Sequence, residues 1–225
     1  MLWILLTLCL LTLPAAAAVQ AQTAAAPETD DQKVLYTLGQ LLGRNVSPAA
    51  LTEDEMKFVL QGLNDQAFGR PSKVDVDQYG PLLQVFMTQH IQAAAGVELV
   101  KAMAFVEEQA KKTGAVRTDS GIIIQEMKAG TGPTPSATDN VKVHYHGTLR
   151  DGTIFDSSVV RNEPVTFPLN QVIACWTEGV QHIHVGGKAR LTCPPDLAYG
   201  PEGRPGIPGN AALVFEVELL EIVAK

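Results

Sequence analysis

The chain has 225 residues, of which 46% are hydrophobic and 18% are charged, and this composition is typical of a globular protein. The formal net charge at pH 7 is −7, and no run of Lys and Arg residues offsets it. This charge argues against nucleic-acid binding, which requires a basic surface. The length is sufficient for one large domain or for two smaller ones.

The chain opens with an apolar segment from Leu2 to Leu13, which Pro14 and four alanines follow. Such a segment is too short for a membrane span and is typical of a secretory signal peptide. We expect a signal peptide over residues 1–21, cleaved after Ala21, and a flexible tail over residues 22–30. No Lys or Arg precedes the apolar segment, so a retained membrane anchor remains the alternative.

Apolar residues with helical spacing follow the tail and predict a helical region over residues 31–77. The apolar face of the first helix consists of Val34, Leu38, Leu41 and Leu42. Ser47 and Pro48 end this helix. Thr52 and Glu55 have the spacing of a capping box at the start of a second helix. The expected buried face of that second helix consists of Met56, Val59, Leu60 and Leu63.

A long helix is expected over residues 78–113, because this segment contains no strong stop signal. Pro81 is expected in its first turn, where a missing N–H costs little. Lys111 and Lys112 favour a helix C-terminus at the end of the segment, and Gly114 supplies the stop. About 35 residues in one helix span about 50 Å. Such a helix cannot bury its apolar face within a small domain, so it pairs with another chain or separates two domains.

At about Val116 the period of the apolar positions changes from about 3.6 residues to about 2 residues, which indicates strands. Val141, Val143 and Tyr145 alternate with polar residues, as does the segment from Leu213 to Leu219. One short helix is expected from Val172 to Val180. The sequence therefore predicts an α+β domain over residues 114–225, in which an antiparallel sheet wraps over one short helix.

Two cysteines, Cys175 and Cys193, remain after the signal peptide is removed. In an oxidising compartment they are able to pair as a disulfide. Alternatively, Cys193 is a small buried hydrophobic residue, because it alternates with Ala189 and Leu191 on the core face of a strand. The sequence alone does not decide between a disulfide and a buried free cysteine.

Residues 114–225 contain seven motifs in a fixed order. They are Val143-His144-Tyr145-His146-Gly147-Thr148-Leu149, Asp151-Gly152-Thr153-Ile154-Phe155-Asp156-Ser157-Ser158, Arg161-Asn162-Glu163-Pro164, Gln171-Val172-Ile173, Trp176-Thr177-Glu178-Gly179, Pro195-Asp196-Leu197-Ala198-Tyr199-Gly200 and Leu213-Val214-Phe215-Glu216-Val217-Glu218-Leu219. These motifs closely resemble those of the FKBP family of peptidyl-prolyl cis/trans isomerases, and the match covers about half of the chain. The order of signal peptide, helical region, long helix and C-terminal domain resembles the Mip/FkpA-like exported group of this family. That resemblance implies a dimerisation arm at residues 31–77, a connecting helix at residues 78–113 and an isomerase domain at residues 114–225.

The resemblance also implies a pocket for the substrate proline, with Trp176 as its floor. The implied walls are Tyr145, Phe155, Val172, Ile173, Tyr199, Ile207 and Phe215. The N–H of Ile173 and the hydroxyl of Tyr199 are expected to bind substrate carbonyls, and Asp156 is expected at the rim, oriented by Arg161 and Tyr145. Val165 stands where many family members have an aromatic residue, so this wall is expected to be shallower. Arg204 and the short segment from Gly206 to Gly209 alter the loop over the pocket.

The chemistry explains why such a pocket is apolar. Rotation about an X–Pro bond must break amide resonance, with a barrier of about 18–20 kcal/mol. At the twisted transition state the carbonyl carries less charge than in the planar amide, so an apolar pocket favours the twisted form relative to water. Catalysis then needs differential binding and no nucleophile, and we expect no cofactor.

Two His-x-His pairs, His144/His146 and His182/His184, have a spacing that is able to bind a metal from one face of a strand. Tyr145 is expected to point inward, so its two histidine neighbours should face outward. No carboxylate or thiolate lies near them in sequence. We therefore expect two solvated pairs and no metal, with a metal site as the alternative.

The resemblance implies unfolded or partly folded proline-containing polypeptides as substrates, a homodimer through the N-terminal helices, and FK506-like macrolides as inhibitors. We expect a periplasmic protein, with outer-membrane or cell-surface association as the alternative, and a membrane contact only if the signal is retained. The principal expected function is rotamase activity that assists the folding of exported proteins, with chaperone activity. The alternative is a periplasmic chaperone or binding module whose isomerase pocket is weak or inactive.

Overall fold

A computed structural model describes residues 26–223 of the chain. The expected signal peptide, its cleavage site and residues 22–25 of the expected tail lie outside these residues. The described residues divide into two units, with the boundary between Gly39 and Gln40. No helix within the described residues is both long enough and apolar enough to cross a membrane.

Helix α1 (Asp30–Val46) begins with two acidic residues, Asp30 and Asp31, and has Arg44 in its last turn. These charges stabilise the two ends of the helix dipole. The short 3-10 helix η1 (Ser47–Ala49) follows, and Pro48 lies in its first turn, so the predicted end of the helix is confirmed. None of the residues of α1 is buried.

Helix α2 (Glu53–Ala67) starts with the predicted capping box. The hydroxyl of Thr52 accepts from the N–H of Glu55 at 3.3 Å, and the Glu55 carboxylate accepts from the N–H of Thr52 at 2.7 Å. The expected burial of its apolar face within the chain is wrong, since Leu60 is 56% exposed and Leu63 is 49% exposed. Within residues 26–223, Val59 of this face is exposed as well, whereas Met56 is half-buried.

Helix α3 (Val76–Ala110) is one continuous helix in the segment where the long helix is expected. The Asp75 side chain accepts from the N–H groups of Asp77 and Gln78, so the helix starts before the predicted position. As a result, Pro81 lies inside the helix, beyond the first turn, and its predicted placement is wrong. Gly114, with φ +76°, follows the helix.

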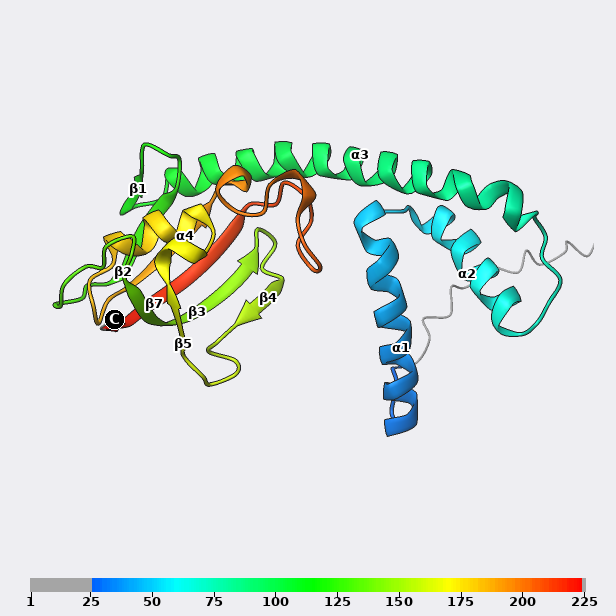
Figure 1. Cartoon of the computed structure of the whole chain (residues 1–225), viewed down its shortest axis with the longest axis horizontal. Helices are drawn as coiled ribbons and strands as arrows, with labels where there is room; N and C mark the ends of the chain where they lie inside the picture. The colour runs from blue at the N-terminus through cyan, green and yellow to red at the C-terminus, as the bar shows by residue number, and fades with distance from the viewer. Residues whose placement is uncertain (1–25, 224–225) are drawn as a thin grey trace, which may run out of the picture. The chain divides into compact units, whose positions relative to one another are not determined.

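The sheet of the second unit contains seven antiparallel strands (Figure 1). They are β1 (Ala115–Arg117), β2 (Ile123–Lys128), β3 (Asn140–Leu149), β4 (Ile154–Ser157), β5 (Val165–Pro168), β6 (Lys188–Cys193) and β7 (Leu213–Val223). Their spatial order is β1-β2-β6-β7-β3-β4, and β5 pairs with β3. Helix α4 (Ala174–Gly179) lies between β5 and β6 in the chain and packs against the sheet (Figure 1). The predicted α+β architecture is confirmed.

The core lies between α4 and the sheet, and the alternation of apolar residues along the strands positions it. Val141, Val143 and Val217 are fully buried, as is Val180 just after α4. The helix is shorter than predicted, because Val172 (ψ 179°) and Ile173 (ψ 147°) adopt extended backbone conformations before its first turn.

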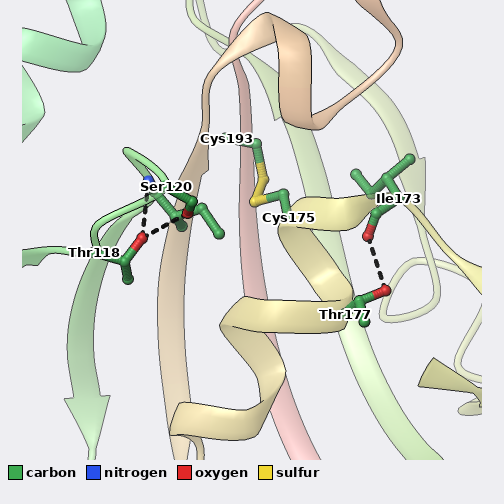
Figure 2. The surroundings of a disulfide bond; sticks show 7 residues. Thr118, Ser120, Ile173, Cys175, Thr177 and Cys193 are labelled. Atoms are coloured by element: carbon green, nitrogen blue, oxygen red, sulfur yellow. Dashed lines mark hydrogen bonds between the residues drawn. A yellow bond between two sulfur atoms is a disulfide. The ribbon is translucent and has the colours of Figure 1, made fainter. Parts of the chain in front are cut away.

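A disulfide joins Cys175 in α4 to Cys193 at the end of β6 (Figure 2). Both residues are fully buried. Cys193 therefore occupies the core face that the strand pattern predicts and is also paired. Thr177, two residues further along α4, donates its hydroxyl to the carbonyl of Leu169 at 2.6 Å. The disulfide ties the helix that carries Trp176 to β6, and the hydrogen bond of Thr177 ties it to the 3-10 helix η2 (Leu169–Gln171).

The C-terminal half of α3 packs against the sheet through a second apolar cluster. Ala102 and Val106 of α3 are buried there with Ile123 and Ala212. At the edge of this contact, Arg150 forms two hydrogen bonds, of 2.8 and 3.0 Å, with the carboxylate of Glu98. The second half of α3 thus belongs to the packed body that contains the sheet.

Candidate functional site

A cavity of about 590 Å³ opens between α4, the sheet and the loop after β6, a size that suits a small ligand or a peptide side chain. Its lining is mostly aromatic and aliphatic. The lining residues are Tyr145, Phe155, Asp156, Val165, Phe167, Gln171, Val172, Ile173, Trp176, Tyr199, Arg204, Pro205, Ile207 and Phe215. The structure therefore brings together every expected wall residue, together with Trp176, Asp156 and Val165.

Trp176 lies at the centre of the aromatic cluster and is 5% exposed. The rings of Tyr145 and Phe215 meet it edge-on, with centroids at 5.2 and 5.1 Å, and Phe167 lies at 5.3 Å. Phe155 meets Phe215 edge-on at 5.5 Å. Edge-to-face contacts hold aromatic rings in fixed orientations, so the apolar surface of the cavity is preformed.

Gly147 in β3 makes room for this cluster. A Cβ atom at this position would lie 2.8 Å from Phe155 and 3.1 Å from Phe215. Any larger residue would therefore push at least one of the two rings out of place.

The rim of the cavity carries a three-residue hydrogen-bond network. The hydroxyl of Tyr145 and the guanidinium of Arg161 both donate to the carboxylate of Asp156, one to each oxygen. A second nitrogen of Arg161 donates to the Tyr145 hydroxyl at 3.2 Å. Arg161 itself does not line the cavity. It holds Asp156 in place from outside.

The pKa values in this network fix its charge at neutral pH. Burial raises the pKa of the Asp156 carboxyl, but the hydrogen bonds from Tyr145 and Arg161 outweigh burial, so this pKa lies below its ordinary value. Burial, and then the hydrogen bond to Asp156, raise the pKa of Tyr145. The hydrogen bond to Asp156 raises the pKa of Arg161. Asp156 and Arg161 therefore form an ion pair, and Tyr145 is a neutral donor.

Tyr199 lines the cavity from the loop after β6. Its hydroxyl accepts a hydrogen bond of 2.8 Å from Nη1 of Arg204, whose guanidinium lies over the Tyr199 ring at 4.8 Å. The N–H of Ile173, just before α4, has no hydrogen-bond acceptor among residues 26–223. Both groups are available to a ligand in the cavity.

Four lining residues were not assigned to the pocket from the sequence: Phe167, Gln171, Arg204 and Pro205. Phe167 could have been found, because it lies two residues after Val165 on the same strand and so faces the same side of the sheet. It supplies an aromatic ring to the part of the lining where Val165 is expected to make the wall shallower. Arg204 was expected only to alter the loop, and its contact with Tyr199 depends on a loop fold that has no periodic signal.

The first histidine pair, His144 and His146, forms polar contacts outside the cavity. His144 Nδ1 lies 3.1 Å from the hydroxyl of Ser158, and His146 Nδ1 lies 3.0 Å from the hydroxyl of Ser157. Within residues 26–223, no group of three or more His, Cys, Asp or Glu side chains is placed to hold a metal ion.

Residues 132–220 match the family model of the FKBP-type peptidyl-prolyl cis-trans isomerases, and residues 31–125 match the model of the domain amino-terminal to them. The FKBP-type isomerase FkpA of Aeromonas hydrophila is 43% identical over 200 residues, which cover 83% of this chain and 74% of that protein. FkpA of Escherichia coli K12 is 38% identical over 219 residues, which cover 91% and 80% of the two chains.

This chain belongs to the FKBP-type peptidyl-prolyl cis-trans isomerase family. The crystal structure of Escherichia coli FkpA matches it with a TM-score of 0.60 at 38% identity, over 88% of this chain and 98% of that one. The family and enzyme class that the sequence motifs predict are therefore confirmed. The cavity around Trp176 lies within the region that the FKBP-type isomerase model matches.

Proposed function

We propose that this FKBP-type isomerase accelerates rotation about X–Pro peptide bonds by binding the twisted amide in the cavity around Trp176. The main support for this proposal is the preformed aromatic lining of the cavity. The substrate proline ring packs on Trp176, and the walls exclude water from the rotating carbonyl. Water stabilises the planar, more polar amide more strongly than the twisted one. Removing water therefore lowers the barrier without a covalent step.

The polar groups of the cavity hold the substrate in this proposal. The N–H of Ile173 and the hydroxyl of Tyr199 donate to carbonyls of the substrate that do not rotate, and so fix the chain on either side of the proline. The ion pair of Asp156 and Arg161 holds the Tyr145 ring upright against Trp176. Val165, Val172 and Ile207 complete the apolar wall around the substrate.

The decisive experiment compares the mature protein with the double variant Tyr199→Phe, Asp156→Ala on a short X–Pro peptide. We expect the parent to accelerate isomerisation and the variant to lose most of this activity. A matched double variant of the remote pair Lys33 and Asp30, changed to Ala, should keep the rate of the parent. A folded parent that fails to exceed the uncatalysed rate would contradict the proposal and would favour a binding module without turnover.

The N-terminal helices support a second role, in dimerisation and in holding clients. Large apolar residues of α2 and of the first half of α3 are exposed in one copy of the chain, among them Phe58 at 76% and Leu83 at 60%. Many large apolar residues exposed along neighbouring segments of a chain normally mark an interaction site. We propose a homodimer formed by residues 31–77 with the adjoining part of the connecting helix, and an isomerase domain at residues 114–225. The paired arms then hold unfolded clients near the two cavities.

The arm is best tested in the full chain, because the C-terminal half of α3 packs against the sheet and a deletion through residue 112 would expose Ile123. We expect the double variant Leu60→Asp, Leu63→Asp to be monomeric in ultracentrifugation and to lose suppression of client aggregation. Its rate on a short peptide should stay near that of the parent. If the monomeric variant still suppresses aggregation fully, the proposal that the dimeric arm holds clients is contradicted.

We propose that the protein acts in the periplasm on proline-containing polypeptides that are still folding. The apolar N-terminal segment and the disulfide support this compartment, because disulfides persist where thiols are oxidised. Cell fractionation combined with N-terminal sequencing should find a mature protein that begins at Gln22. Recovery of the intact N-terminus in the membrane fraction would instead indicate a retained anchor.

A further inference from the structure

Arg204 occupies a fixed position at the mouth of the cavity. Its N–H donates to the carbonyl of Ile207 at 3.0 Å, and the N–H of Ile207 donates back to the carbonyl of Arg204 at 2.8 Å. Gly203, just before it, has φ +62°, and a Cβ at that position would collide with the carbonyl oxygen of Ile207. The loop backbone is therefore tightly folded, and Ile207, which is 5% exposed, anchors it to the core.

The side chain of Arg204 is held by Tyr199. Nη1 donates to the Tyr199 hydroxyl at 2.8 Å, and the guanidinium stacks over the ring at 4.8 Å from its centroid. Arginine has no acceptor, so Tyr199 must accept in this contact. The hydroxyl proton of Tyr199 therefore remains available for a substrate carbonyl. Arg204 keeps further N–H groups that this contact does not use.

The charge at the mouth of the cavity is not balanced. Two charged side chains line it, Asp156 and Arg204, and Asp156 is already paired with Arg161. Among residues 26–223, Arg204 takes part in no ion pair with a carboxylate. The cavity thus presents one unpaired cation beside an apolar floor.

We propose that Arg204 makes this site selective for X–Pro segments in which an acidic residue directly flanks the proline. The proposal rests on the proposed isomerase function of the same cavity. With the proline on Trp176 and a substrate carbonyl on the Tyr199 hydroxyl, the side chain of a flanking residue lies within reach of the guanidinium. A carboxylate there accepts two parallel hydrogen bonds from a group that stacking has already oriented.

The expected size of the effect follows from the exposure of Arg204. An ion pair at a solvent-exposed site changes binding only modestly, so we expect about a threefold preference for Glu over Gln beside the proline. Lys should be disfavoured by a similar factor. Raising the salt concentration should reduce both differences, since exposed charges are screened.

The test measures kcat/KM and Kd on matched peptides that carry Glu, Gln or Lys immediately before or immediately after the proline. The full-length parent is compared with Arg204→Gln, Arg204→Lys and Arg204→Glu. The control is Arg70→Glu, because Arg70 also lies over an aromatic ring, Phe68 at 5.4 Å, but in the arm. Arg70→Glu changes the net charge of the protein by the same amount as Arg204→Glu.

We expect the parent, Arg204→Lys and Arg70→Glu to prefer Glu, Arg204→Gln to lose the preference, and Arg204→Glu to prefer Lys. The preference should appear mainly in KM and Kd. Equal kcat/KM and Kd for all three peptides in the parent, at both positions, would overturn the role of Arg204 while leaving the isomerase intact. If the parent shows no turnover but binds the Glu peptide more tightly than the others, the isomerase proposal is overturned. The selectivity of Arg204 for acidic residues is then supported by Kd alone.

Discussion

The side-chain amide of Asn210 donates a hydrogen bond of 3.1 Å to the backbone carbonyl of Ala95 in the middle of α3. The N–H of Asn210 donates to the carbonyl of Gly200 at 2.7 Å, and Gly200 follows Tyr199 directly. At Gly209, an added Cβ would lie 3.2 Å from the Cβ of Ala95, which shows how closely loop and helix approach. The loop that carries Tyr199 and Arg204 is thus tied to the long helix.

This contact predicts that Asn210→Gly loosens the Tyr199 loop. Asn210 has φ +59°, which Gly also adopts without strain, so the substitution removes the side-chain hydrogen bond and leaves the backbone conformation accessible. We expect a loss of about 1 kcal/mol in the free energy of unfolding and about a twofold lower kcat/KM on an X–Pro peptide. Denaturant unfolding and peptide kinetics measure the two effects.

Asn162→Gly is the matched control for Asn210→Gly. Asn162 also has a positive φ, of 53°, and its side chain forms no hydrogen bond with residues 26–223. The control should lose clearly less stability. Equal losses in the two variants would mean that the contact between Asn210 and Ala95 contributes nothing.

The disulfide between Cys175 and Cys193 should stabilise the fold mainly through the unfolded state. The two residues are 18 positions apart, and closing a loop of about this length is worth about 3 kcal/mol. We expect the double variant Cys175→Ala, Cys193→Ala to lose roughly this amount in denaturant unfolding. A reductant present throughout unfolding should lower the stability of the parent and leave the double variant unchanged. If reductant destabilises both proteins equally, the disulfide is not the cause.

Glu216 predicts a pH-dependent contribution to stability. Its carboxylate on β7 accepts hydrogen bonds of 2.7 Å from both Lys188 and Arg190 on β6. These hydrogen bonds, that of Lys188 first, lower the pKa of Glu216 below its ordinary value. Because the folded-state pKa is the lower one, the contribution is present above the unfolded-state pKa and is lost as the pH falls through the folded-state value.

We therefore expect Glu216→Gln to be about 1–2 kcal/mol less stable than the parent at pH 7, and the difference to shrink toward zero in acid, below about pH 4. Denaturant unfolding across this pH range measures it. Glu218→Gln serves as the control, because Glu218 makes a single, longer contact of 3.5 Å with Lys128. A difference between Glu216→Gln and the parent that does not change with pH would contradict the assigned ion pairs.

The sequence predicts the elements whose signals are local. The capping box of Thr52 and Glu55, and the alternation of Val141 and Val143, both depend on residues close together in the chain. Pro81 was misplaced because Asp75 caps the helix earlier than the proline indicates. The contact between Arg204 and Tyr199 could not be predicted, because it depends on a loop held by Gly203 and by packing on Ile207.

The exposed apolar face of α2 shows a second limit of prediction from the sequence. The spacing of Leu60 and Leu63 correctly identifies an apolar face, but helical periodicity does not say what covers it. Within one chain this face remains exposed. For the cavity, the motifs identify the wall residues by resemblance, whereas their contacts with one another depend on side-chain packing between strands far apart in sequence.

Replacing Gly147 or Gly96 by alanine should change the free energy of unfolding in opposite directions. Gly147→Ala places a methyl group 2.8 Å from Phe155 and 3.1 Å from Phe215, so one ring must move, and we expect a loss of about 1–3 kcal/mol in stability. The activity on X–Pro peptides should fall more than tenfold if the two rings form the proposed wall. Gly96→Ala in α3 meets no atom within 4 Å and should instead raise the free energy of unfolding by about 0.5–1 kcal/mol at unchanged activity.

Denaturant unfolding, the fluorescence of Trp176 and peptide kinetics separate the two glycine variants. The edge contact of Phe215 with Trp176, at 5.1 Å, means that a displaced ring should also change the environment of the indole. Gly147→Ala should therefore shift the emission, whereas Gly96→Ala should not. If Gly147→Ala retains the activity of the parent while its emission shifts, the rings have moved without consequence, and the wall of Phe155 and Phe215 plays no part in catalysis.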